Sequence, residues 1–475
     1  MAYSKLEIIK SLLWKLLEKC SVQGLSFIVT VILARILTPA EYGLVAIVAV
    51  FISFSNILID GGFNTALIQK KGYDNRDFST IFYFSLFVAL VIYAILFFCS
   101  GLIASFFNEP QLALIIKVLG ISLFFCAVNS IQKAYVAKKL LFKKMFYSSL
   151  IASVLSGAMA IVMALLGWGV WALVFYSIIS QILITAAMWI TVKWRPVLFF
   201  SKSNFKVLFD FGWKIMTTQA VISLFVNVRS VIISKYYNST MLAYFDKGKL
   251  LPALVMDNVN SSLQAILFPV FSEAQDDRGK VKEMIRRSIR TNCLLAFPMM
   301  VALAVMAETV VVTIFTEKWL MMVPFVQIFA ISYILMPMQL INMEAVKSLG
   351  YSNITLKLEV VKKVIEIAIL VFTTMLSVQA IAWGVVLYNF ICLFINLSPN
   401  IKLLNYSFKE QCRDFMPQLL AAVFMGGCIL LSSFLPVGNL LKLLLQFIVG
   451  ISSYFIVCRV FSIESFMYVY KSFRK

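Results

Sequence analysis

The sequence contains no histidine, and charged residues make up only 13% of its 475 positions. The missing imidazole removes the most common general base and metal ligand, so histidine-based catalysis is excluded. An ordinary soluble domain carries roughly 25% charged residues. Water is therefore not the solvent for most of this surface. The eight cysteines have no Cys-x-x-Cys spacing, and we interpret them as small apolar residues.

Long apolar runs take the place of charge, because 61% of the residues are hydrophobic. No charged residue lies between Lys144 and Lys193, a length that fits two spans of about 20 residues joined by a turn at 167–169. Continuous apolar runs favour α-helices over the alternating strands of a β-barrel. The sequence predicts an all-α polytopic membrane protein with about 14 transmembrane helices. We expect them at 11–36, 44–68, 78–107, 111–133, 145–166, 168–191, 207–235, 241–268, 288–315, 322–346, 355–376, 378–399, 416–435 and 440–460.

The 42 basic residues outnumber the 22 acidic ones, giving a net charge of +20. They cluster in short loops rather than on one soluble face, which argues against a nucleic-acid partner. Because cytoplasmic loops carry an excess of Lys and Arg, both termini are predicted to lie in the cytoplasm. The basic segments are Lys5 to Lys19, Lys70, Lys71 and Arg76, 133–144, 193–206, 278–290, Lys347 and Lys357, 402–413 and the C-terminal tail.

A weak internal repeat appears at an offset of 200 residues, where segment 31–35 aligns with 231–235. Six helices separate the two segments, and an even number of spans preserves orientation, so the repeats are expected to be parallel. The predicted organisation is a six-helix lobe at 1–195, a second at 196–405, and two additional helices with a cytoplasmic tail at 406–475. Thr38-Pro-Ala-Glu41 predicts a helix start, since it supplies an N-cap, a proline and a glutamate in capping-box spacing.

Polar residues form a stripe on one face of the expected helix 44–68, at spacings of three or four. This stripe consists of Ser53, Asn56, Asp60 and Asn64. At the 200-residue offset, helix 241–268 carries a second stripe of Asp257, Asn260 and Gln264. Polar groups inside a membrane are costly and are functional candidates by default. The stripes fit a hydrophilic cavity between lobes, and hydrogen bonding between helices within each lobe is the alternative.

The basic candidates inside the expected spans are Lys15, Lys19, Lys117, Lys214, Arg229, Lys247 and Lys249. Lys15 and Lys19 are close enough to a helix end to snorkel to the interface instead of binding a ligand. Arg229 lies about six residues from the end of its helix, roughly 9 Å deep. Its planar fork suits phosphate oxygens, so we expect it to bind an anionic ligand.

Helix 355–376 contains Glu359, Lys362, Lys363 and Glu366, whose spacing allows mutual neutralisation. The alternative is that Glu366 joins Asp60 or Asp257 as a proton or sodium site. No cofactor is expected apart from such a coupling ion.

Several short segments together resemble a known family. They are Leu33-Ala-Arg-Ile-Leu-Thr-Pro-Ala-Glu-Tyr-Gly43, 66–69, 167–174, 194–196, Phe211-Gly212, 268–272 and Lys318-Trp319. The chain resembles the polysaccharide-export branch, comprising the O-antigen, colanic-acid and teichuronic-acid exporters, of the multidrug/oligosaccharidyl-lipid/polysaccharide flippase superfamily. The resemblance implies two six-helix bundles in a V, with helices 1, 2, 7 and 8 lining a cavity. It also implies a polyprenyl-diphosphate-linked oligosaccharide as substrate, with membrane lipids, a polysaccharide polymerase and glycosyltransferases as partners.

Two other functions are compatible with such a membrane protein. A multidrug exporter of the same superfamily would share the helix count, but a cationic cavity repels cationic drugs. A membrane-embedded polymerase or glycosyltransferase usually needs a large outer loop with catalytic groups, and every expected loop is short. We therefore expect a transporter rather than an enzyme. The chain departs from the resemblance at Arg229, where relatives often carry an aspartate, which puts ion coupling by that helix in doubt.

Overall fold

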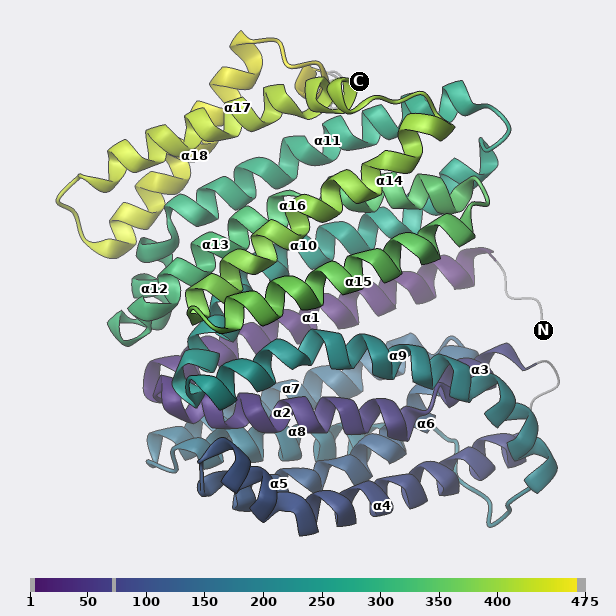
Figure 1. Cartoon of the computed structure of the whole chain (residues 1–475). Helices are drawn as coiled ribbons and strands as arrows, with labels where there is room; N and C mark the ends of the chain where they lie inside the picture. Colours follow the sequence, from purple (N-terminus) through teal and green to yellow (C-terminus); the bar gives the residue numbers. More distant parts are fainter. Residues whose placement is uncertain (1–4, 71–73, 468–475) are drawn as a thin grey trace. The chain divides into compact units, whose positions relative to one another are not determined.

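The computed structural model describes residues 5–70 and 74–467, in which every regular element is a helix (Figure 1). The prediction of an all-α polytopic membrane protein is confirmed. Lys71 and the basic tail beyond residue 467, both used in the topology prediction, lie outside the described residues.

The chain divides into two compact units, Met1–Ala243 and Tyr244–Lys475, with the division inside helix α10. The predicted lobe boundary after residue 195 stays a prediction. In the first unit the helices are α1 (Lys5–Ile36), α2 (Pro39–Asp60), α3 (Phe63–Gln69), α4 (Asn75–Phe107), α5 (Gln111–Gly120), α6 (Ser122–Lys138), α7 (Phe142–Leu165), α8 (Val170–Thr191) and α9 (Lys202–Tyr236).

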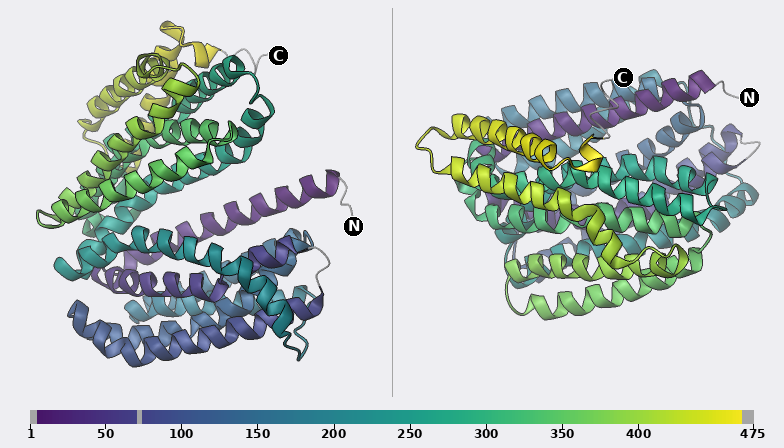
Figure 2. Two further views of the ribbon diagram at one scale, coloured as in Figure 1. Left: turned by 45° about the vertical axis from the view of Figure 1, so that its right-hand side comes forward. Right: turned by 90° about the horizontal axis from the view of Figure 1, so that it is seen from above.

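The second unit contains most of α10 (Ser239–Glu273) and the remaining helices. These are α11 (Arg278–Val305), α12 (Ala307–Phe315), a 3₁₀ helix (Glu317–Met322), α13 (Val323–Ile334), α14 (Met336–Ser348), α15 (Ser352–Thr374), α16 (Val378–Leu403), α17 (Phe408–Ser433) and α18 (Asn439–Val460). The last two pack against each other as a hairpin, and Figure 2 shows them at one edge of this unit.

Small residues let helices approach closely in the first unit. The buried face of α7 is made almost entirely of Ser, Ala and Gly. A Cβ on Gly157 would lie 2.5 Å from a methyl carbon of Val29, so α1 and α7 touch at this point. Such faces are typical of helix pairs in membranes, where close van der Waals packing replaces the hydrophobic effect.

Buried amides join helices in the second unit. Asn400 donates to the side chain of Asn342 at 2.8 Å, and Asn342 donates to Gln411 at 3.1 Å. Further along α14 and α16, Asn396 donates to Gln339 at 3.2 Å. These bonds satisfy polar groups that would otherwise face hydrocarbon, and they fix the register of α14, α16 and α17.

Twelve helices or helix pairs of the described chain are long and apolar enough to cross a membrane. The prediction of about 14 is therefore approximate. The two expected helices outside this set, α10 and α15, are long enough but carry more charge. Within α15 there are five charged residues, and α10 contains two prolines and its polar stripe. Their polarity is the reason that hydropathy alone does not identify them.

Four of the expected spans are two consecutive helices. The sharpest break divides expected span 44–68 at Gly61 and Gly62, where both residues have positive φ angles of 54° and 69°. Glycine adopts this left-handed conformation without steric cost. The bounds of α5 and α6, α11 and α12, and α13 and α14 show the other three breaks. The predicted turn at 167–169 is confirmed, since α7 ends at Leu165 and α8 begins at Val170.

The structure repeats the helix boundaries at the predicted offset. Helices α1 and α9 end at Ile36 and Tyr236, and α2 and α10 begin at Pro39 and Ser239. The predicted capping box at Thr38 and Glu41 is confirmed.

Candidate functional site

The first polar stripe ends in a hydrogen-bonded cluster at the break between α2 and α3. Asp60, the last residue of α2, accepts a hydrogen bond from the hydroxyl of Ser130 on α6 at 2.5 Å. Asn64 on α3 donates to the same carboxylate and, at 2.9 Å, to Ser130. The break thus places two stripe residues beside a third polar side chain from another helix. Part of the stripe is therefore satisfied by bonds within the unit, as the packing alternative expects.

A close backbone contact holds this break in position. A Cβ on Gly62 would lie 2.5 Å from the carbonyl oxygen of Gly212 on α9. Gly212 in turn lies near the Gly61 carbonyl, so neither position has room for a side chain. The two segments that carry Asp60 and Lys214 are thereby packed against each other.

Three amide oxygens of the two stripes are buried and have no hydrogen-bond partner among the described residues. They belong to Asn56, Asn64 and Asn260. A buried polar atom left without a partner costs about 1–3 kcal/mol. A polar ligand or water would satisfy these atoms, which is what the cavity interpretation requires. Asn56 also lies beside the Cys126 thiol.

The second stripe lies on α10. Asp257 and Gln264 are exposed in the unit, and Asn260 is half-buried. Asp257 is near Tyr333 of α13. Two turns or more towards the start of α10, Lys247 and Lys249 are half-buried beside Asp246. The predicted polar and basic residues of α10 are therefore partly exposed and partly half-buried.

The other basic candidates differ in exposure. Lys15, Lys19 and Lys214 are exposed, and Arg229 is half-buried. The ammonium of Lys15 lies 5.6 Å from the ring centroid of Phe142 at the start of α7. That distance fits a cation–π contact at a helix end, in line with the interfacial alternative for Lys15.

The charged residues of α15 pair as their spacing predicted. Lys362 binds Glu359 at 2.5 Å, and Lys363 binds Glu366 at 2.7 Å. The structure confirms mutual pairing, while an ion-coupling role of Glu366 stays a prediction. No group of three His, Cys, Asp or Glu side chains is placed to hold a metal in the part of the chain that the structure describes.

Two buried aspartates outside the predicted set also organise polar networks. Asp77 at the start of α4 accepts hydrogen bonds from Lys70 and Asn204, both at 2.8 Å. The Asp74-x-x-Asp77 spacing of a capping box is a local signal that points to this residue.

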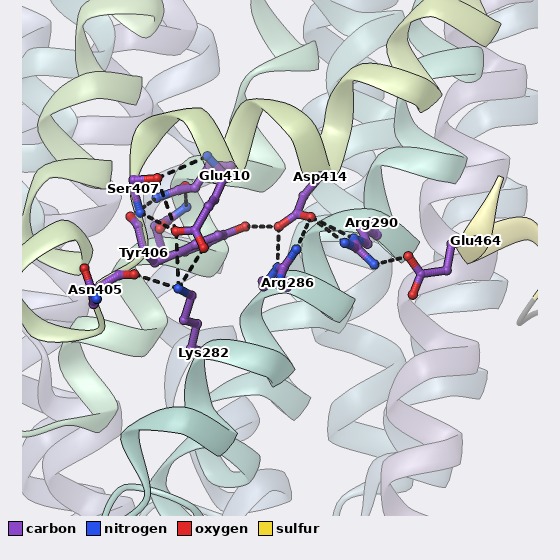
Figure 3. Close-up of polar contacts among 11 residues, drawn as sticks. Lys282, Arg286, Arg290, Asn405, Tyr406, Ser407, Glu410, Asp414 and Glu464 are labelled. Atoms are coloured by element: carbon purple, nitrogen blue, oxygen red, sulfur yellow. Dashed lines mark hydrogen bonds and ion pairs between the residues drawn. The ribbon is translucent and has the colours of Figure 1, made fainter.

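Asp414 on α17 is the centre of the larger network (Figure 3). Its carboxylate accepts hydrogen bonds from Arg286 at 2.8 and 2.9 Å and from Arg290 at 2.6 and 2.9 Å. Tyr406 donates to it at 2.7 Å. Burial, together with this bond, raises the pKa of Tyr406 above its usual range. Arg286 and Arg290 are four residues apart on α11, so they share one helix face and one partner can bind both.

Comparisons with known proteins agree with this architecture. Residues 32–324 match the model of a family described as "Polysaccharide biosynthesis protein". The succinoglycan biosynthesis transport protein ExoT of Rhizobium meliloti is 24% identical over 321 residues, covering 67% of this chain and 65% of that protein. The teichuronic acid biosynthesis protein TuaB of Bacillus subtilis is 24% identical over 289 residues, covering 59% of each. The matched region thus spans less than two thirds of these relatives.

A solved structure shares the fold over nearly the whole chain. The lipid II flippase MurJ in an inward closed conformation superimposes with a TM-score of 0.75. The superposition covers 95% of this chain and 98% of that one at 16% sequence identity. At this identity the similarity concerns the fold.

Proposed function

The chain belongs to the family of polysaccharide biosynthesis proteins, and from this premise we propose that it is a flippase for a polyprenyl-diphosphate-linked oligosaccharide. It acts by alternating access in the bacterial cytoplasmic membrane, with both termini in the cytoplasm. Its product supplies a polysaccharide polymerase, and its substrate comes from glycosyltransferases. The chain itself is not a catalyst.

The observation that carries this proposal is the pair of polar stripes on α2–α3 and α10. Their buried amide oxygens lack partners among the described residues, and the two stripes are separated by the 200-residue offset at which the helix boundaries repeat. Amide groups donate and accept hydrogen bonds, so they suit the hydroxyl groups of a sugar. In this proposal Asn56, Asn64, Asn260 and Gln264 contact the oligosaccharide.

The charged head of the substrate requires cations. Arginine binds phosphate oxygens through a planar fork, and lysine acts as a point charge. We assign the diphosphate to Arg229, with Lys214, Lys247 and Lys249 contributing to the positive potential. Lys15 and Lys19 contribute at the entrance, and the isoprenoid tail stays in lipid.

Ion coupling is assigned to the carboxylates of the same region. Asp60 lies at the break of a membrane helix, an arrangement that transporters use at binding sites. A carboxylate that binds a proton or sodium ion in one conformation and releases it in the other biases the alternating equilibrium. Asp257, one turn before the Asn260 that aligns with Asp60, is the candidate on α10, and Glu366 is the third.

Flipping can be measured directly in proteoliposomes. The substrate is a polyprenyl diphosphate with a fluorescent oligosaccharide, placed in both leaflets, and an impermeant quencher reports the outer fraction. Full quenching in the presence of the protein, against about half in empty liposomes, is the expected result. Half quenching in both would reject the flippase.

The same preparation separates the two alternatives. A multidrug exporter would move a cationic dye such as ethidium, whereas the flippase would leave it untouched. A glycosyltransferase or polymerase would lengthen the oligosaccharide or consume a nucleotide sugar. Either activity without lipid flipping would replace the proposed function.

A further inference from the structure

A pocket of about 1110 Å³ opens among α11, α17 and α18, and no residue of the polar stripes lines it. All of its lining residues belong to the second unit. One end is polar and contains Arg286, Arg290, Arg413, Asp414 and Glu464. The other end is apolar and is lined by Leu420, Ala421, Phe424 and Val457, while Phe461 lies three residues before Glu464. The pocket is therefore amphipathic along its length.

The polar end has an excess of positive charge, with three arginines and two carboxylates. The carboxylate of Asp414 has no exposed area and is held by Arg286 and Arg290. Arg286 uses Nε and Nη2 for this contact, and among the described residues no acceptor binds its Nη1. Arg413 is exposed and forms no ion pair or hydrogen bond within the described chain. Both groups can donate to an anion.

At the polar end of the pocket, the carboxylate of Glu464 is an anion that binds arginine more weakly than a phosphate does. It binds Arg290 (Figure 3), yet its own side chain is 80% exposed. An exposed ion pair of this kind contributes about 0–1 kcal/mol. An incoming phosphate, with more acceptor oxygens, would compete with it for Arg290.

The apolar end of the pocket, called the slot below, is lined by exposed side chains. Leu420 and Phe424 are 61% and 57% exposed. Phe424 lies ten residues beyond Asp414 on α17, a rise of roughly 15 Å. This matches half of a hydrocarbon core of about 30 Å, and hence the depth of one leaflet. The slot fits an acyl chain that spans one leaflet.

We propose that this pocket binds an anionic glycerophospholipid from the leaflet that faces the predicted cytoplasmic side. The phosphate contacts Arg413 and Arg286, and one acyl chain lies along Leu420 and Phe424. A polyprenyl carrier is a less suitable occupant because its chain is longer than the slot. The lipid joins the α17–α18 hairpin to α11, and it stabilises the folded protein by mass action.

Native mass spectrometry of the full-length protein in detergent tests this proposal. Dioleoyl phosphatidylglycerol should bind more tightly than dioleoyl phosphatidylcholine. Arg413→Gln should weaken phosphatidylglycerol binding about fivefold, since one basic group near a membrane surface contributes about that much to anionic-lipid affinity. Leu420→Trp should weaken both lipids by filling the slot. Glu464→Gln should retain or strengthen binding, because it removes the competing carboxylate.

Matched controls exclude general effects of charge or bulk. Arg459→Gln removes an exposed arginine outside the pocket, and Leu430→Trp adds bulk elsewhere on α17; both should bind as the wild type does. The proposal is overturned by equal affinity for the two phospholipids, or by wild-type binding in Arg413→Gln and Leu420→Trp. Displacement of phosphatidylglycerol by an equal concentration of a polyprenyl phosphate would assign the pocket to the carrier instead.

Discussion

Arg286 on α11 binds Asp414 on α17 through two hydrogen bonds of 2.8 and 2.9 Å, although the two residues are 128 positions apart. The Asp414 carboxylate is fully buried, whereas the arginine side chain is 34% exposed. A buried carboxylate is stable only when its lone pairs are occupied. This contact therefore fixes the position of α17 on α11.

Replacing Asp414 by Asn should lower the stability of the second unit. The change leaves Arg286 and Arg290 without their shared counter-ion, and loss of one partner of a buried pair costs about 3–5 kcal/mol. Glu464→Gln removes an exposed partner of Arg290 and should cost at most about 1 kcal/mol. Thermal unfolding in detergent compares the two. Equal melting temperatures would show that the network contributes nothing to packing.

Substitution of Gly62 at the α2–α3 break should also lower the stability of the protein. Gly62→Ala places a Cβ 2.5 Å from the Gly212 carbonyl and forces alanine to a φ of +69°. The left-handed conformation alone costs about 1–2 kcal/mol. Gly101→Ala is the control, since nothing lies within 4 Å of its Cβ. We expect a lower melting temperature for the first variant and an unchanged or higher one for the second. Wild-type stability of Gly62→Ala would contradict the contact between this break and α9.

Local signals in the sequence identify much of the fold. Apolar runs locate the helices, and the Thr38–Glu41 capping box locates the start of α2, because both signals involve residues close in sequence. Charge lowers the hydropathy of α10 and α15 below that of a simple span. The glycine pair at 61 and 62 is visible, but its role depends on the approach of Gly212 from a distant helix.

The candidate site is less predictable because its contacts join distant segments. The helical spacing of Asp60 and Asn64 places them on one face, yet Ser130, their partner from α6, has no signal in the sequence. Asp414 likewise has no local signal, since its arginine partners lie on α11. Spacing predicts which residues share a helix face, and only tertiary packing determines what that face meets.

The predicted topology places 110 and 438 outside the cell and 139 inside it. Single cysteines at Pro110 or Gly438, in a variant without the eight native cysteines, should react with an impermeant thiol reagent in intact cells. A cysteine at Lys139 should react only after the membrane is opened. Labelling of a cysteine at position 139 in intact cells would show that the orientation in the membrane is the opposite of the predicted one.

The proposed ion coupling predicts that at least one of Asp60 and Asp257 is required for transport. Asp60→Asn and Asp257→Asn each keep the side-chain shape and remove the charge. We expect at least one variant to lose about tenfold in export rate, equivalent to 1.36 kcal/mol, at unchanged melting temperature. Ser130→Ala, which removes the hydrogen bonds of Ser130 with Asp60 and Asn64 but no charge, should remain active. If both Asn variants export polymer at the wild-type rate, neither carboxylate couples transport to an ion, and the stripes serve only helix packing.

The proposed diphosphate contact makes Arg229 the most sensitive position. Lysine keeps the positive charge but lacks the bidentate fork, so Arg229→Lys should be partly active and Arg229→Ala nearly inactive. Polymer export in cells, normalised to protein in the membrane, measures both. Full activity of Arg229→Ala would remove Arg229 from the substrate site.

The competing explanation is that Arg229 serves as the counter-ion of Asp246. Under that explanation, Arg229→Ala fails because it leaves an uncompensated carboxylate inside the membrane, and Asp246→Ala fails for the opposite reason. The double variant leaves neither charge, so it should recover export. A diphosphate contact predicts no recovery, because the substrate's negative charge still lacks its arginine. Export by Arg229→Lys, Arg229→Ala, Asp246→Ala and the double variant therefore separates the two roles. Recovery of export in the double variant would eliminate the diphosphate contact.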